Sequence, residues 1–140
     1  MQDREQFGQF NSEHLRSIRP GIELFNQQKY WECHEELEEL WLSDRGDNAR
    51  FVYWAIIQVA TCLIHYREEN IIGANGMLKK ALEKISKIEN LQVETDLLYN
   101  YLNWKNFKYE LKSIPEAPRL ENFKNLFEYR FTPEPVTWEI

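Results

Sequence analysis

The segment from residue 51 to residue 64, F-V-Y-W-A-I-I-Q-V-A-T-C-L-I, constrains the fold more than any other part of the sequence. On a helix that turns about 100° per residue, its apolar side chains point in nearly every direction around the axis. A helix that is apolar all round is typical of one that is surrounded by other elements. We therefore predict a central helix from about Ala49 to Glu68, with other helices packed around it.

The rest of the chain is also expected to be helical. The 140 residues include only five glycines and five prolines, and no window shows the sustained alternation of a half-buried strand. A chain of 140 residues is long enough to bury a core without metals or disulfides, and its 43% of hydrophobic residues supply the apolar area for one. We predict an all-α, compact bundle of about five helices in a single domain that spans residues 1–140.

Prolines and potential helix-capping residues indicate where the other helices begin and end. Pro20 is expected near the first turn of the first helix, Asp47 or Asn48 at the start of the central helix, and Asn70 at the start of the next one. With the central helix, these signals give helices at residues 19–27, 30–42, 49–68, 70–89 and 94–112. After Pro115 we expect an irregular tail, residues 115–140, with one short helical run. Its apolar residues should pack along the bundle or against a neighbouring chain; they are Phe127, Phe131, Val136 and Trp138.

Charge and cysteine content exclude several classes of function. The formal net charge is −6, and the 17 Lys and Arg residues are scattered, so we expect no nucleic-acid binding. Cys33 and Cys62 lie in apolar helical patterns, which is typical of reduced cytoplasmic thiols. The N-terminus lacks the apolar stretch of a signal peptide, and no later segment is apolar for the roughly 18 residues that span a bilayer. We expect a cytoplasmic protein with no membrane partner.

The acidic segment H-E-E-L-E at residues 34–38 differs from the zinc-protease pattern H-E-x-x-H at one position. His34 and Glu38 are four residues apart and therefore share a helix face, at the edge of the apolar side of helix 30–42. The other glutamates of this helix point largely to solvent, and the acidic run is most simply a solvated face.

The central helix carries polar residues that should need partners. Gln58 and His65 lie on one side of a helix expected to be buried nearly all round. Burying an amide or imidazole without a partner costs about 1–3 kcal/mol. Because consecutive helices with a short connection usually pack antiparallel, the nearest partners are His34 and Glu38. The sequence thus predicts a polar pocket between helices 30–42 and 49–68.

A metal centre is the alternative interpretation of the same residues. His34, Glu38 and His65 offer two imidazoles and a carboxylate, a ligand set known for zinc and non-haem iron. This set is minimal, and a five-residue pattern arises easily by chance in a glutamate-rich helix. We therefore expect neither a metal nor another cofactor, with zinc or iron as the alternative.

Two stretches carry a family resemblance, F-N-Q-Q-K-Y-W-E-C-H-E-E-L-E-E-L-W and I-I-Q-V-A-T-C-L-I-H-Y-R-E-E-N-I-I-G-A. Together they resemble the family called domain of unknown function 309, over about residues 18–90. The resemblance implies an all-helical bundle and no particular reaction; the tail is not covered. The sequence departs from the usual family form at Cys33 and Glu69. The implied signature residues are His34, Glu35, Glu38, Trp41, Gln58, His65, Asn70, Gly73 and Ala74.

Three functional hypotheses follow. The first is a cytoplasmic helical domain that binds a small molecule or a partner protein at the polar pocket, formed by His34, Glu35, Glu38, Trp41, Gln58, His65 and Asn70. The second is a metal-dependent hydrolase or oxygenase that uses His34, Glu38 and His65, supported by Glu35 or Gln58. The third is an interaction scaffold whose C-terminal segment docks on a second copy, as in a homodimer, or on another protein. The sequence leaves open whether the protein is an enzyme.

Overall fold

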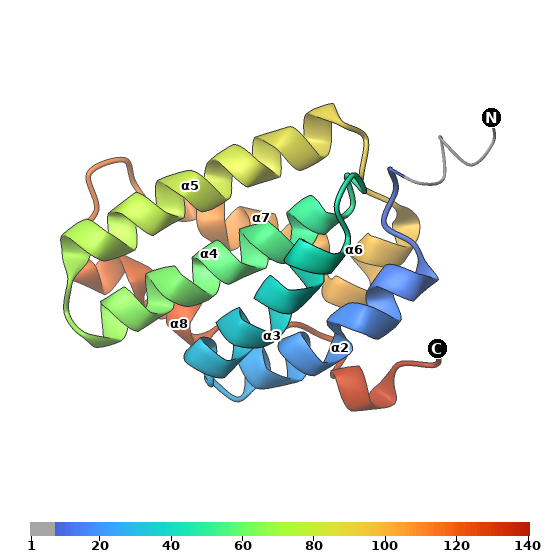
Figure 1. The fold of residues 1–140 in the computed structure, drawn as a ribbon. Helices are drawn as coiled ribbons and strands as arrows, with labels where there is room; N and C mark the ends of the chain where they lie inside the picture. The colour runs from blue at the N-terminus through green and yellow to red at the C-terminus, as the bar shows by residue number, and fades with distance from the viewer. Residues whose placement is uncertain (1–7) are drawn as a thin grey trace.

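The computed structural model describes residues 8–140, and all regular structure in this range is helical, as predicted (Figure 1). The predicted absence of a signal peptide falls largely on residues 1–7, outside the described residues. The α-helices are α2 (Ser12–Asn26), α3 (Tyr30–Ser43), α4 (Arg50–Arg67), α5 (Ile71–Asn90), α6 (Asp96–Leu102), α7 (Trp104–Ser113) and α8 (Lys124–Glu128). Two short 3₁₀ helices, η1 (Leu120–Phe123) and η2 (Pro135–Thr137), lie in the tail.

Helix α4 lies at the centre of the bundle, which confirms the interpretation of its apolar pattern. It packs against α5 along most of its length and against α3 on another side (Figure 1). Tyr53, Ile56 and Leu63 have no exposed surface, although they point in different directions around the helix. Burial on several sides explains why this segment contains almost no charged residue between its ends.

Helix α2 begins seven residues before the predicted start at Arg19. Asn11 caps it, because its side chain accepts hydrogen bonds from the backbone N–H groups of Glu13 and His14. The His14 ring accepts a hydrogen bond from the Asn11 N–H through Nδ1 and contacts Asp47 through Nε2, at 2.6 Å. Pro20 therefore lies inside the helix and not in its first turn.

The predicted helix 94–112 consists of two helices, α6 and α7, so the estimate of about five helices was too low. The chain bends at Asn103, which adopts a left-handed conformation with φ of 45°. Asparagine tolerates this conformation better than most residues. The bend lets Leu102 and Trp104, on either side of it, both be fully buried.

The other predicted boundaries agree with the structure within one or two residues. Asn70 caps α5 by accepting a hydrogen bond from the N–H of Gly73 at 3.0 Å, as predicted. Helix α4 starts at Arg50, and Asp47 accepts a hydrogen bond from the N–H of Ala49 just before it.

The tail packs along the bundle of its own chain, which is one of the two arrangements predicted for it. Asn26 at the end of α2 forms two hydrogen bonds with the Phe131 backbone, as donor at 2.9 Å and as acceptor at 2.8 Å. The indole N–H of Trp138 donates to the carbonyl of Pro133 at 2.9 Å, and the Trp138 ring is nearly buried. Val136 was also expected to pack on the bundle, but it is 69% exposed.

None of the helices in the described part of the chain combines the length and the apolar character that a membrane crossing requires.

Candidate functional site

The His34 cluster lies on the exposed side of α3 and contains Trp31, His34, Glu35 and Glu38. The Nδ1 atom of His34 lies 3.2 Å from a Glu35 carboxylate oxygen, and its Nε2 atom lies 3.5 Å from a Glu38 oxygen. The Glu38 contact confirms that positions 34 and 38 share a face. Glu35, which the helical projection directs to solvent, also reaches the imidazole.

Trp31 belongs to this cluster and was not predicted from the sequence. Its ring stacks on the His34 ring, with centroids 5.3 Å apart and planes only 6° from parallel. The side chain is nevertheless 61% exposed. The spacing of three residues before His34 is the signal that could have identified it, because such residues are neighbours on a helix surface.

Trp41 joins α3 to α4. Its ring lies 4.2 Å from the Trp54 ring, centroid to centroid, and the Arg50 guanidinium lies 3.8 Å above it. Arg50 also donates a hydrogen bond to the Trp41 carbonyl at 3.1 Å. The Lys84 ammonium of α5 lies 4.2 Å from the centre of the Trp54 ring. Trp41 thus joins α3 to α4, and Trp54 in turn contacts α5 through Lys84.

His65 and Asn70 form the junction between α4 and α5. The Asn70 side-chain nitrogen lies 3.3 Å from Nδ1 of His65, while its oxygen caps Gly73. The same Nδ1 atom lies 3.9 Å from a Glu68 carboxylate oxygen. A Cβ atom at Gly73 would lie 2.7 Å from the His65 ring, so only glycine leaves room for the imidazole.

Gln58 is buried on α4, with 5% of its surface exposed. Its carbonyl oxygen Oε1 has no hydrogen-bond partner among the described residues. The sequence predicted His34 as the partner, but both nitrogens of that ring face carboxylates of α3. Among the described residues, no hydrogen bond joins the His34 cluster, Gln58 and His65, which the sequence predicts in one pocket.

Only one group of side chains in residues 8–140 has the composition and spacing to hold a metal ion. It consists of His34, Glu35 and Glu38, whose ligand atoms lie within 4.8 Å of one another. His65, the third ligand of the metal hypothesis, is not part of it. All three donors come from one helix, and both carboxylates are exposed, so the group leaves much of a coordination shell to water.

The two thiols are poor candidates for nucleophiles. Cys33 and Cys62 are both buried and unpaired by disulfides. Burial raises the pKa of the Cys33 thiol to about 12, with the Glu36 carboxylate adding to the effect. Burial likewise raises the pKa of the Cys62 thiol to about 12. At neutral pH neither cysteine carries the thiolate that covalent catalysis requires.

A groove runs along the outer side of α3, next to the His34 cluster. We call it the α3 groove; its volume is about 440 Å³, and it is lined by Leu24, Trp31, Glu32, Glu35, Glu36, Glu38, Glu39 and Leu42. Trp31 and Leu42, which is 51% exposed, provide apolar surface at its two ends. Five glutamates lie between and beside them, with no basic residue in the lining. The α3 groove is therefore apolar in part and strongly negative.

Replacing Gln58 with methionine is expected to raise the free energy of unfolding by about 1 kcal/mol. Methionine has nearly the same shape, and the change removes a buried carbonyl oxygen that has no partner in the described residues. Urea unfolding followed by circular dichroism measures the effect. Gln58→Glu, of the same size but charged, serves as the control and should be less stable than the parent. A methionine variant that is clearly less stable would show that Oε1 has a favourable partner.

Comparison with known proteins confirms the family resemblance read from the sequence. Residues 18–77 match the model of a family described as Domain of unknown function (DUF309). The matched segment holds the His34 cluster, Gln58, His65 and Gly73, and it excludes the tail. The chain is also 33% identical over 73 residues to a protein of Bacillus subtilis (strain 168) described as uncharacterized protein YpuF. That match covers 52% of this chain but only 41% of YpuF. No solved structure matches the chain.

Proposed function

We propose that this chain is a binding domain that receives a positively charged segment of a partner protein in the α3 groove. The observation that carries this proposal is the exposure of Trp31 and Leu42 among five glutamates on one helix face. Single exposed apolar residues are common on protein surfaces, but a large aromatic ring at the end of an acidic groove is typical of a recognition site.

The His34 cluster supports this role by holding the Trp31 ring in place. Stacking on the imidazole restricts the indole to one orientation, which reduces the entropy that binding would otherwise cost. Glu35 and Glu38 then serve two purposes, because they fix His34 and add negative charge to the groove. Complementary charge increases the association rate and disfavours acidic partners.

A partner protein fits the α3 groove better than a small molecule does. The groove is open to solvent along a helix, and its apolar ends at Trp31 and Leu42 are separated by three helical turns. A basic amphipathic helix or extended segment can contact both ends at once, with Lys or Arg side chains facing the glutamates.

Selection of peptides from a random-sequence display library tests the proposal. Peptides that bind the purified protein are expected to be enriched in Lys and Arg together with apolar residues, and their binding should weaken as salt rises. They should bind the Trp31→Ala variant roughly tenfold more weakly, as expected for an aromatic hot spot. Tyr109→Ala is the matched control, because Tyr109 is similarly exposed, at 68%, but lies on α7. Selected peptides that are acidic, or that bind both variants equally well, would refute the proposal.

Metal binding at His34, Glu35 and Glu38 is the second candidate, because their ligand atoms lie close together. Such a site would bring back the hypothesis of a metal-dependent hydrolase or oxygenase. The single-helix origin of the donors and the distinct surroundings of His65 favour the partner-binding proposal instead.

Elemental analysis of the purified protein is expected to find no stoichiometric zinc, iron or manganese. The physical reason is that three donors on one exposed helix face form a weak site, in which at least one further ligand must come from water. His34→Ala and His65→Ala are the informative variants. Stoichiometric metal that is lost in both variants would establish the metal site predicted as the alternative from the sequence.

A further inference from the structure

Helices α3 and α5 run in roughly the same direction on either side of α4 (Figure 1). Side chains of all three helices meet at the Trp54 ring, which contacts Trp41 of α3 and the Lys84 ammonium of α5. Phe51, one turn earlier on α4, likewise contacts both Trp41 and the Lys87 ammonium. The three rings remain partly exposed. We call this surface the α3–α5 face; the three rings form its middle, and the charged side chains of α3 and α5 form its two edges.

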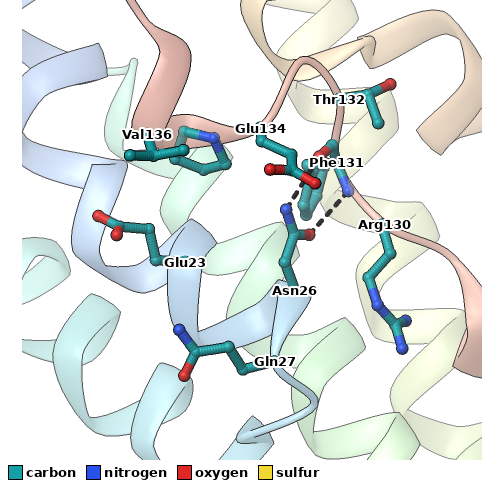
Figure 2. Close-up of a pocket in the computed structure, with 9 residues that line it drawn as sticks. Glu23, Asn26, Gln27, Arg130, Phe131, Thr132, Glu134 and Val136 are labelled. Atoms are coloured by element: carbon teal, nitrogen blue, oxygen red, sulfur yellow. Dashed lines mark hydrogen bonds between the residues drawn. The ribbon is translucent and has the colours of Figure 1, made fainter.

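The C-terminal tail docks on other parts of the bundle. Asn26 of α2 holds the Phe131 backbone by two hydrogen bonds, and the pocket beside them is lined by residues of the tail and of the end of α2 (Figure 2). Earlier in the tail, the Phe127 ring lies 5.1 Å from the Tyr66 ring, centroid to centroid. On a regular helix Tyr66 points roughly 120° away from Trp54. Among the described residues, no aromatic contact joins the tail to the rings of the α3–α5 face.

Helix α3 forms the acidic edge of this face. It contains five glutamates and neither lysine nor arginine. Glu35 and Glu38 contact His34, at 3.2 and 3.5 Å, and form no other ion pair in the described part of the chain. One imidazole carries at most one positive charge, so the charge of at least one of these two carboxylates remains unbalanced.

Helix α5 forms the basic edge. Lys80, Lys84 and Lys87 are three or four residues apart and therefore lie on one side of the helix. None of them forms an ion pair within residues 8–140. Partial burial lowers the pKa of the Lys84 ammonium, and repulsion from Lys87 and Lys80 adds to this effect. The Glu83 carboxylate opposes the shift. Negative charge supplied from outside the chain would therefore stabilise this edge.

We propose that the partner of the α3 groove is a second copy of this chain, whose α5 supplies the positively charged segment. This inference rests on the proposed function, because Glu35 and Glu38 line the α3 groove and also belong to the acidic edge. Among two-fold axes in the plane of the α3–α5 face, one parallel to α4 places α3 of each copy over α5 of the other. Each contact between glutamates and lysines then forms twice. A perpendicular axis places α3 on α3, with glutamates facing glutamates.

A second copy matches the whole α3–α5 face, whereas other partners match one edge. An acidic protein or a nucleic acid pairs with the lysines of α5 but is repelled by the glutamates of α3. A short basic peptide occupies only the acidic edge. In the dimer the rings of Trp41, Phe51 and Trp54 face their equivalents across the axis, which gives the interface an apolar centre and a charged rim.

Sedimentation equilibrium of the purified full chain tests this inference. The parent is expected to form a dimer whose dissociation constant rises with salt concentration. One double variant combines Glu35→Lys with Glu38→Lys, and the other combines Lys80→Glu with Lys87→Glu. Each variant alone places like charges opposite one another in both contacts, so its dissociation constant should be roughly a hundredfold higher. An equal mixture of the two variants restores opposite charges in both contacts and should form a dimer about as stable as that of the parent.

The combination of Lys105→Glu with Lys124→Glu is the matched control. It changes the net charge as the α5 variant does, but these exposed lysines lie on α7 and α8, so the dimer should persist. Circular dichroism verifies that each variant is folded. The inference is wrong if the parent stays monomeric at its highest soluble concentration, if either reversed variant dimerises like the parent, or if mixing them restores no dimer. A monomeric parent that still binds basic peptides through Trp31 would refute this inference alone. If basic peptides also fail to bind, the proposed function is wrong as well.

Discussion

Replacing Phe131 with alanine is expected to lower the free energy of unfolding by about 3–5 kcal/mol, the range for large aromatic residues removed from a core. Phe131 has no exposed surface, and its ring contacts Phe25, Phe107 and Tyr129, which belong to α2, α7 and the tail. The substitution opens a cavity where these three elements meet. Urea unfolding followed by far-ultraviolet circular dichroism measures the loss.

Val136→Ala is the matched control for this experiment. Val136 lies in the same tail but is 69% exposed, so its truncation should change the free energy of unfolding by no more than about 0.5 kcal/mol. Equal stability of the Phe131→Ala variant and the parent would mean that the tail does not dock on the bundle.

The position of α4 was predictable because its pattern has one physical interpretation. A segment with apolar side chains on all sides gains stability only when neighbours cover those sides, and α3, α5 and η1 pack against α4 here. The start of α5 was predictable for a local reason, since Asn70 can cap the helix with its own side chain.

Two predicted helix boundaries were wrong, because one local sequence signal was misinterpreted and the other was absent. Pro20 indicates a helix start, but Asn11 provides a capping side chain earlier in the chain. The bend at Asn103 has neither glycine nor proline to mark it. Its left-handed conformation is sustained by the burial of Leu102 and Trp104 on both sides, which is a tertiary effect.

In the candidate site, contacts between residues of one helix could be predicted from the sequence, but contacts between helices could not. The spacing of His34 and Glu38 determines that they meet, because residues four apart share a helix face. Whether His34 approaches Gln58 or His65 depends on how far α3 and α4 slide and rotate against each other. That register is set by contacts such as Trp41 with Trp54, which helical periodicity does not specify.

The second large effect on stability is expected where α2 crosses α3, because Gly21 has no side chain at this close contact. A Cβ atom at Gly21 would lie 2.7 Å from Cγ of Leu37 and closer still to one of its methyl groups. Leu37 is fully buried, so it cannot move aside without disturbing the core. At Gly76 on α5, by contrast, a Cβ atom would meet no heavy atom within 4 Å.

Gly21→Ala is therefore expected to have a free energy of unfolding about 1–3 kcal/mol below that of Gly76→Ala. Both substitutions increase helix propensity by a similar amount. The difference between the free energies of unfolding of the two variants therefore measures the cost of overpacking at the α2–α3 crossing. Urea unfolding of the two variants measures it. Adding Leu37→Ala should cost less in the Gly21→Ala background than in the parent, because the clash is then relieved. Equal stability of the two alanine variants would show that α2 and α3 are not in close contact at Gly21.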